Sequence, residues 1–376
     1  MEAYLDNSAT TPVCAQAVQA MQQAINITWG NPSSLHRVGL MAEHLLNQSR
    51  AAVAASLSCT PGEITFTSGG TEANNLAVLG TAAARARQGR RIVTSSVEHS
   101  SIAESCAELA KRGYDVVYLG VDNTGRVKED ELAAAINHET ILVSLMAVNN
   151  EVGTVQPIDA IRRAVRQAQA PALIHCDAVQ AFGKLPVHPQ HLGVDLLTVS
   201  SHKIHGPKGA GALYIRNGVK IQPILYGGSQ EKRLRPGTEA MPAVAGFAAA
   251  AAAFLDHTQS LDYVTSLRDR LISGLQAMPG VYINSPPDAL PYLTNISVPG
   301  IPSEVMINFL TERNVHVSSG SACAKGAKSR VLQAMHLPDS YITSALRISL
   351  SRLTNWEEID AFLYALAEAV VTLLRM

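Results

Sequence analysis

Residues 194–215 read VDLLTVSSHKIHGPKGAGALYI and contain two short apolar runs joined by a turn. The first run, residues 194–199, is rich in leucine and β-branched residues and ends in small polar ones, which predicts a short buried strand. The second run, residues 212–215, follows a Gly-Pro-Lys-Gly turn and predicts another strand. Lys203 is therefore expected on a tight connection, just past the end of a strand.

A lysine in this place is suited to forming a Schiff base. Burial disfavours the ammonium form and leaves a nucleophilic amine. The alternative is a solvated loop lysine, which is the commoner environment for an isolated Ser-His-Lys. The rest of the chain has to decide between these two interpretations of Lys203.

The composition predicts a large buried fraction. Charged residues make up 16% of the 376 residues and apolar residues 47%, whereas about 25% of an average chain is charged. We expect two domains and an oligomeric interface.

The charge balance and the absence of long apolar stretches limit the partners. The 30 basic and 31 acidic residues nearly cancel, and no long basic run with interleaved aromatics suggests nucleic acid as a partner. The first residues lack a signal-peptide pattern, and no uncharged apolar stretch of about 18 residues occurs. We expect a soluble, cytoplasmic protein that does not bind a membrane.

The five cysteines, at positions 14, 59, 106, 176 and 323, lie far apart. They form no C-x-x-C pair and no zinc-like spacing, so neither a disulfide framework nor a metal site is expected. Cys323 differs from the others because it lies in a loop of Ser, Gly and Ala, where it is expected to be exposed. Lys325, Lys328 and Arg330 follow closely and would favour its thiolate form.

Strands that alternate with helices predict a parallel α/β sheet, whose ligands gather at the carboxyl ends of the strands. His99, the pair Asn149-Asn150, and Asp177 each follow an expected strand. A lone histidine is more often a hydrogen-bonded structural residue, and an aspartate here can also be a helix N-cap. A buried Asp177 would need a cation or a strong hydrogen-bond donor.

A small-residue loop at the start of a helix predicts an anion site. Residues 63–67 alternate like a strand, residues 68–70 form a glycine turn, and Thr71 opens an Ala-rich helix. The free N–H groups and positive dipole end of such a helix favour a phosphate. The alternative is a plain helix N-cap at Thr71.

Nearer the N-terminus, Thr11-Pro12 predicts the start of a helix running to about residue 24.

The C-terminal third predicts a smaller α+β domain. Helical stretches at about 256–278, 303–313 and 355–374 flank short strands, one of them over residues 294–298. We expect a large domain over residues 13–255, and a small domain made of residues 1–12 and 256–376. Arg347 is a lone cation in an alternating strand pattern there, and we expect a carboxylate partner, either a structural acid or a substrate.

Together these pieces resemble the cysteine desulfurases (NifS/IscS-like) of the class V aminotransferase group of pyridoxal-phosphate enzymes. The resemblance covers nearly the whole chain, and its motifs are weak singly but specific in this order. The motifs are LDNSATTP (5–12), GNPSS (30–34), TSGGTEANN (67–75), EH (98–99), VNNEVG (148–153), DAVQ (177–180), SHKIHGPKG (201–209), RPGT (235–238) and SSGSAC (318–323).

The resemblance implies the fold type I of pyridoxal-phosphate-dependent transferases, with a mostly parallel seven-stranded sheet in the large domain. It implies that Lys203 is the Schiff-base lysine, that Asp177 partners the pyridine nitrogen, and that His99 stacks on the ring and shuttles protons. The remaining implied positions are Gln180 and Asn150 at the ring hydroxyl and substrate; Gly70, Thr71, Ser200 and His202 at the phosphate, with Thr238 from the other subunit of a homodimer; and Arg347, with Asn31 nearby, at the substrate carboxylate.

The implied reaction converts L-cysteine to L-alanine and leaves the sulfur on Cys323 as a persulfide. The sulfur then passes to an acceptor protein, such as an iron–sulfur scaffold or a thiolation enzyme. Two departures leave the acceptor open: the basic run of residues 324–328, and an end at Met376 directly after the last expected helix. Gly70 also stands where the family commonly has Ala. The alternatives are a selenocysteine lyase or an aminotransferase of the same fold, and a non-catalytic sulfur-carrying scaffold.

Overall fold

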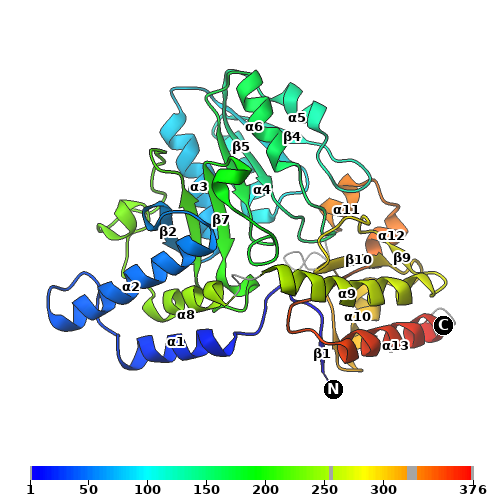
Figure 1. Ribbon diagram of the computed structural model, residues 1–376. Helices are drawn as coiled ribbons and strands as arrows, with labels where there is room; N and C mark the ends of the chain where they lie inside the picture. Colours follow the sequence, from blue (N-terminus) through cyan, green and yellow to red (C-terminus); the bar gives the residue numbers. More distant parts are fainter. Residues whose placement is uncertain (1, 254–256, 320–327, 374–376) are drawn as a thin grey trace.

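The computed structural model describes residues 2–253, 257–319 and 328–373, and these form a seven-stranded sheet with two smaller sheets (Figure 1). The strand order of the large sheet is β2-β8-β7-β6-β5-β3-β4. Strand β8 runs antiparallel to both of its neighbours, and the other pairs are parallel. The strands are β2 (Ile64–Thr67), β3 (Arg91–Ser95), β4 (Asp115–Leu119), β5 (Thr140–Met146), β6 (Leu173–Asp177), β7 (Leu196–Ser200) and β8 (Gly211–Ile215). The mostly parallel seven-stranded sheet is confirmed.

Both faces of this sheet are buried, as the continuous apolar runs of its strands require. Neighbouring residues of one strand enter different cores: Leu142 faces the first core and Val143 the second. On the first face lie α3 (Gly70–Arg85) and α4 (Ser100–Lys111), and on the second lie α6 (Ile158–Gln167) and α8 (Met241–Ala252). Because helices cover both faces of the sheet, the ends of the strands are where polar side chains can gather around a ligand.

The remaining elements of the N-terminal two thirds cover the edges and connections. Helices α1 (Ala15–Asn26) and α2 (Arg37–Ser56) pack on α8 below the sheet in Figure 1. The short elements are η1 (Pro61–Glu63), α5 (Glu129–Ala135), α7 (Pro189–Leu192), η2 (Ser201–Lys203) and η3 (Gln230–Arg233). No helix within the described ranges is long and apolar enough to cross a membrane.

The C-terminal part forms an antiparallel sheet of order β12-β10-β9, and β11 pairs in parallel with the N-terminal strand β1. The strands are β1 (Ala3–Tyr4), β9 (Tyr282–Ile283), β10 (Leu293–Ser297), β11 (Val315–His316) and β12 (Ala345–Ser349). The helices are α9 (His257–Gln276), α10 (Ser303–Thr311), α11 (Arg330–Ala334), α12 (Asp339–Thr343) and α13 (Trp356–Leu373). The N-terminal residues thus join the C-terminal part, and the domain boundary at residues 12/13 and 255/256 stays a prediction.

The expected helix start at Thr11-Pro12 is wrong, because α1 begins at Ala15. Thr11 is engaged elsewhere: its N–H and its hydroxyl both donate to the carbonyl of His202, at 3.0 Å each, and Oγ1 accepts from the N–H of His205 at 2.8 Å. A threonine that caps a helix would not be available for these bonds. The N-terminal segment therefore braces the turn that carries Lys203.

A buried histidine lies inside the large sheet. His175 on β6 is fully buried, with Nδ1 2.8 Å from Ser144 Oγ and Nε2 3.0 Å from Thr198 Oγ1. Burial lowers the pKa of His175 to about 3. The folded chain therefore keeps this imidazole neutral between the ordinary histidine pKa and a pH of about 3, a range in which the unfolded chain protonates it.

This predicts a loss of stability on acidification. Between pH 6.5, the ordinary histidine pKa, and about 3, the unfolded chain binds a proton that the folded chain does not, so the free energy of unfolding falls as pH falls. His175 alone accounts for about 2 kcal/mol of this fall between pH 7 and pH 5. Urea unfolding at both pH values should show a fall smaller by that amount in His175→Gln than in the parent, and an equal fall in both would contradict the account.

Candidate active site

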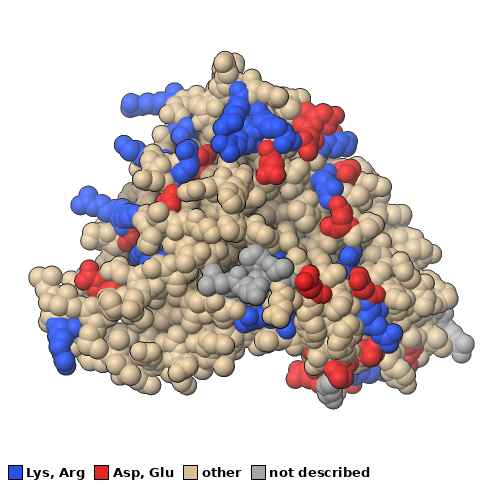
Figure 2. Space-filling view, viewed as in Figure 1, with Lys and Arg blue, Asp and Glu red and all other residues tan. Residues whose placement is uncertain are grey.

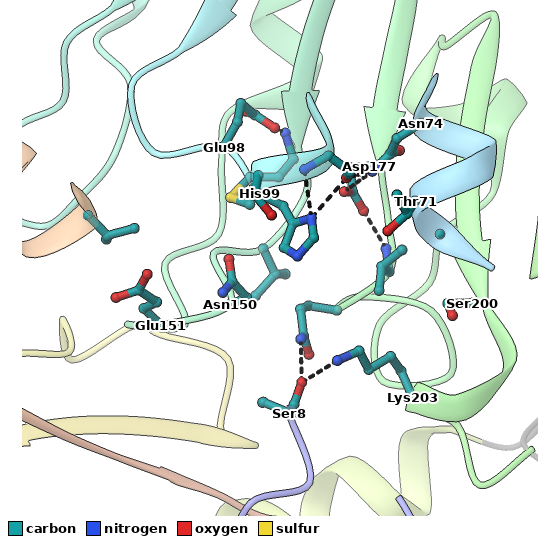
Figure 3. A pocket seen from close by; sticks show the side chains of 18 of the residues that line it. Ser8, Thr71, Asn74, Glu98, His99, Asn150, Glu151, Asp177, Ser200 and Lys203 are labelled. Carbon is teal, nitrogen blue, oxygen red and sulfur yellow. Dashed lines mark hydrogen bonds between the residues drawn. The ribbon is translucent and has the colours of Figure 1, made fainter. Parts of the chain in front are cut away.

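A cavity of about 610 Å³ lies at the carboxyl ends of the parallel strands (Figure 3). It brings together residues from β6, β7 and β12, from the first turns of α3 and α4, and from the N-terminal segment. Ten of the residues expected from the sequence line it: Gly70, Thr71, His99, Asn150, Asp177, Gln180, Ser200, His202, Lys203 and Arg347.

Lys203 is fixed by its turn and by the N-terminal segment. The chain leaves β7 and turns at once through η2, and a Cβ on Gly206 would lie 2.1 Å from Ser201 Oγ, so the turn is as tight as the sequence predicted. Lys203 Nζ donates to the carbonyls of Ser8, at 2.5 Å, and Ala9, at 2.9 Å. The amine therefore lies inside the cavity and is not a solvated loop lysine.

Asp177 is the last residue of β6 and is buried. Its Oδ2 accepts from Asn74 Nδ2 at 2.7 Å, and its Oδ1 accepts from the backbone N–H of Val179 at 2.9 Å. The strong donors expected for a buried acid are therefore an amide and a backbone group. Figure 3 shows this carboxylate facing the cavity across from Lys203.

His99 is the N-cap residue of α4. Its Nδ1 accepts from the backbone N–H of Ser101 at 3.2 Å and lies 2.8 Å from Ser101 Oγ. Burial lowers the pKa of His99; the charges of Lys203 and Arg330 lower it further, while Asp177 acts in the opposite direction. The ring is therefore neutral at neutral pH.

The loop before α3 has the properties of an anion site. Gly69 is its N-cap with φ 155°, a region open essentially to glycine, and a Cβ on Gly70 would lie 2.9 Å from the Val179 side chain. The first-turn N–H groups of this 16-residue helix have no acceptor within the helix. Ser200 Oγ is buried and has no hydrogen-bond partner among the described residues. Backbone donors and a hydroxyl thus point at one end of the cavity.

His202 also lines the cavity, two residues after Ser200 in the sequence. Its Nδ1 is 3.2 Å from Thr10 Oγ1. Burial lowers the pKa of His202 to about 4, assisted by the charges of Lys203 and Lys208. The His202 imidazole is therefore a neutral hydrogen-bonding group at neutral pH.

Arg347 lies on β12 with a side chain only 2% exposed. Nη2 pairs with Asp6 Oδ1 at 2.8 Å, and Nη1 donates to the carbonyl of Asn150 at 3.0 Å. The expected structural acid is therefore Asp6, and the guanidinium also lines the cavity, where a second carboxylate can approach. Of the two expected partners, the structural acid is present as Asp6, and a substrate carboxylate stays a prediction.

Three expected residues are not brought into this cavity by the described part of the chain. Asn31 and Thr238 are exposed and are not among the described residues that line it; Asn31 Oδ1 accepts from the N–H of Ser33 at 2.9 Å. Cys323 lies outside the described residues. Their roles stay predictions.

Described residues on either side of Cys323 in the sequence contact cavity residues or line the cavity themselves. Ser318 pairs with Arg347 through two backbone hydrogen bonds, of 2.6 and 3.2 Å. Ser329 Oγ donates to Glu151 Oε2 at 2.5 Å, and Lys328 and Arg330 line the cavity.

Two buried polar residues in or beside the site, Glu98 and Lys184, could not be recognised from the sequence. Glu98 Oε1 accepts from Ser95 Oγ and from the N–H of Met146, and burial raises the pKa of Glu98 to about 8. Lys184 Nζ donates to Gln180 Oε1 at 3.1 Å, and burial lowers the pKa of Lys184 to about 7. Glu98 belongs to the EH motif at residues 98–99, but only its burial in the structure sets it apart. No feature of the sequence distinguishes Lys184.

Comparison with known proteins identifies the family. The family model "Aminotransferase class-V" matches residues 3–362. The chain belongs to this family. Within it, the chain is a member of the cysteine desulfurase (NifS/IscS-like) group, since its relatives carry that name over nearly its whole length.

Two such relatives are "Cysteine desulfurase IscS" of Methanosarcina thermophila and "Cysteine desulfurase 2" of Trichormus variabilis. The first is 42% identical over 99% of this chain and 93% of its own length. The second is 43% identical over 96% of this chain and 91% of its own. A solved structure titled "NIFS-LIKE PROTEIN" superposes with a TM-score of 0.94, at 36% identity over 99% of this chain and 100% of that one. The fold type I architecture of this group is therefore confirmed.

The Asp6–Arg347 pair generates a stability prediction. Removing one partner of a buried ion pair costs about 3–5 kcal/mol, and because Asp6 is 22% exposed we expect Asp6→Ala to lower the free energy of unfolding by about 2 kcal/mol. Urea unfolding measures this. The matched control is Asp288→Ala, which breaks an Asp–Arg pair exposed on the surface and should change stability by less than about 1 kcal/mol. Equal effects of the two substitutions would contradict the assignment.

Proposed function

We propose that this protein is a pyridoxal-phosphate-dependent cysteine desulfurase, which converts L-cysteine to L-alanine and transfers the sulfur to Cys323. One observation carries the proposal: Lys203, Asp177 and His99 converge on a cavity that also has an anion-binding end and a buried arginine. A lysine amine, a carboxylate and an anion cradle are the three features that pyridoxal phosphate requires of a protein.

The residues present fit this cofactor. The phosphate would be bound by the Ser200 hydroxyl, which has no partner in the described part of the chain, by the first turn of α3 with Gly70 and Thr71, and by His202. Lys203 would bind the group covalently through Nζ, and Asp177 would accept from its pyridine nitrogen. The glycine at position 70 also suits this cradle, because the space for a Cβ is already taken by Val179.

When bound, pyridoxal phosphate stabilises the electron pair that remains after a bond at the substrate's Cα breaks. We propose that His99 covers one face of the ring, and that Gln180 and Asn150 contact its hydroxyl and the substrate. Gln180 Nε2 donates to the carbonyl of Ser8 and Oε1 accepts from Lys184. The second N–H of the Gln180 amide is therefore available to donate a hydrogen bond into the cavity.

Arg347 would bind the substrate carboxylate, which places the amino acid between β12 and Lys203. The guanidinium needs no rearrangement for this, since Asp6 and Asn150 already fix its plane. Once the substrate amine has displaced it from the group, Lys203 Nζ would take the proton from Cα, because this amine lies in the cavity beside Ser8 and Ala9. Asn31 is proposed to act near the same carboxylate.

Cys323 would act as the nucleophile. Its thiolate attacks the substrate sulfur, so that a sulfur–sulfur bond forms as the bond between that sulfur and Cβ breaks. The electron pair passes to Cβ, which takes up the proton of the substrate thiol; Cα regains the proton that Lys203 took, and alanine leaves. Support comes from the described residues on either side, Ser318 and Ser329, which contact the cavity residues Arg347 and Glu151.

The persulfide would then pass its sulfur to an acceptor protein, such as an iron–sulfur scaffold or a thiolation enzyme. We place this chemistry in the cytoplasm, where thiols stay reduced. The four described cysteines, Cys14, Cys59, Cys106 and Cys176, are free thiols, as such a compartment requires.

Replacing the nucleophile tests the function. In Cys323→Ala we expect alanine formation from L-cysteine to fall by more than about a hundredfold, with no persulfide, while the visible absorbance of bound pyridoxal phosphate is kept. The matched control is Cys59→Ala, which removes a half-buried thiol whose pKa burial raises to about 12, and which should keep full activity. Sulfide and alanine release by Cys323→Ala at the parent rate would refute the proposal.

We further propose that two copies of the chain form a homodimer. A group of exposed apolar side chains lies on α1, on the start of α2 and on the connection between them: Val18, Ile25, Ile27, Trp29, Leu35, Leu40 and Met41. So many exposed large apolar residues within one stretch of the chain are typical of an interface. Thr238 is exposed and is not among the described cavity residues, in keeping with a role in the partner's phosphate site.

The dimer is tested by sedimentation equilibrium. We expect a mass of two chains for the parent and a marked shift toward one chain for Leu35→Glu, because this side chain is 93% exposed and its replacement leaves the folded chain intact. The matched control is Leu353→Glu, at an exposed leucine far from this group in the sequence, which should remain dimeric. A single-chain mass for the parent would contradict the proposal.

A further inference from the structure

Asn74 lies where two of the site's functional groups meet. It is the fifth residue of α3, is 1% exposed, and uses one amide nitrogen for two contacts (Figure 3). Nδ2 is 2.7 Å from Asp177 Oδ2 and 2.8 Å from Ser101 Oγ. Since a carbonyl oxygen would repel the carboxylate, the nitrogen must face Asp177, and this fixes the orientation of the amide.

The orientation of Asn74 determines the direction of the next hydrogen bond. An amide N–H can only donate, so Ser101 Oγ accepts from Asn74 and its own proton is available to another acceptor. His99 Nδ1 lies 2.8 Å from Ser101 Oγ. The backbone N–H of Ser101 also points at this nitrogen, at 3.2 Å. Two donors therefore meet at Nδ1, which leaves no place there for a proton.

We propose that Asn74 is a positioning residue that acts through Ser101 to fix His99 as the tautomer with its proton on Nε2. A neutral imidazole carries one proton, and with Nδ1 serving as acceptor that proton must be on the other nitrogen. Figure 3 shows the other ring nitrogen of His99 directed into the cavity. His99 thus presents a hydrogen-bond donor to whatever the cavity binds.

The consequence for the reaction rests on the proposed function. In this tautomer His99 cannot take a proton from the substrate at Nε2, and Nδ1 is occupied by its two donors. The α-proton therefore goes to Lys203 Nζ, and His99 donates a hydrogen bond from its fixed position. The same amide group of Asn74 thus serves two functional residues. It donates to Asp177 directly, and it donates to Ser101, the serine that orients His99.

The test is the tautomer itself, measured by nitrogen-15 NMR of the full chain labelled at histidine, with and without bound pyridoxal phosphate. His99→Gln identifies the His99 signals by their disappearance. In the parent we expect one protonated ring nitrogen at His99, Nε2, and one unprotonated, Nδ1. A parent with the proton on Nδ1, or with both nitrogens protonated at neutral pH, would overturn the proposal.

Two variants test the relay. Asn74→Asp replaces the donor by an acceptor of the same size, so Ser101 Oγ should donate to it; Nδ1 then keeps the backbone N–H of Ser101 as its donor, and His99 should become a mixture that includes the tautomer protonated on Nδ1. Ser101→Ala removes the hydroxyl and leaves the backbone N–H, so His99 should become a mixture of tautomers. Should Asn74→Asp fail to fold, Ser101→Ala decides the matter alone: an unchanged His99 spectrum would overturn the proposal.

The chain offers a matched control in the next residue. Asn75 lies on the same helix and also contacts α4, where Oδ1 accepts from Ser105 Oγ at 3.0 Å, but no described contact joins it to Asp177 or Ser101. Asn75→Asp makes the same change in charge and should leave the His99 tautomer as in the parent. Equal spectra for Asn74→Asp and Asn75→Asp would contradict the relay. Alanine release by the parent is scored separately, so failure of the proposed function and failure of the relay are distinguishable.

Discussion

The carboxylate of Asp177, buried at the end of β6, is the constraint on which the site depends. A buried carboxylate is costly unless donors surround it, and this one receives donors from Asn74 on α3 and from the backbone of Val179. To supply the first donor, α3 must start close to β6, which is possible because position 70 is a glycine. The same closeness brings the free N–H groups of α3 to the cavity. The need of the buried Asp177 carboxylate for donors thus also determines where the anion-binding end of the cavity lies.

The N-terminal segment connects the two halves of the site. Asp6 pairs with Arg347 of the C-terminal sheet, and the carbonyls of Ser8 and Ala9 accept from Lys203 of the large sheet. Thr11 then braces the Lys203 turn through three hydrogen bonds. A segment without much regular structure therefore aligns an arginine and a lysine that lie 144 residues apart in the sequence. Figure 2 shows that this face of the molecule carries basic and acidic side chains side by side in several places.

The sequence predicted well what depends on local pattern. Lys203, Asp177 and His99 follow apolar strands, and parallel topology brings strand ends to one edge, so their meeting in a single cavity was foreseeable. Gly70 and Thr71 were foreseeable from the glycine turn before a helix. The order of the motifs then indicated the family.

What depends on tertiary contacts was not foreseeable. No local sequence feature distinguishes Asn74 from Asn75. The two side chains leave α3 in different directions, and for this reason Asn74 contacts Asp177 whereas Asn75 contacts Ser105. Asp6 and Arg347 pair across nearly the whole chain, and Thr11 makes long-range bonds where its sequence favoured a helix cap. Thr238 acts, on our proposal, in the site of a second chain, which the pattern of one chain cannot reveal.

The most direct test of the central claim is the mass of the peptide that contains Cys323. The cofactor-loaded protein is mixed with one equivalent of L-cysteine carrying a heavy sulfur isotope, without reductant. We predict that this peptide gains one labelled sulfur atom, and that one alanine is released for each sulfur gained. An unmodified Cys323 alongside full release of alanine, or labelled sulfur on another cysteine, would contradict the account.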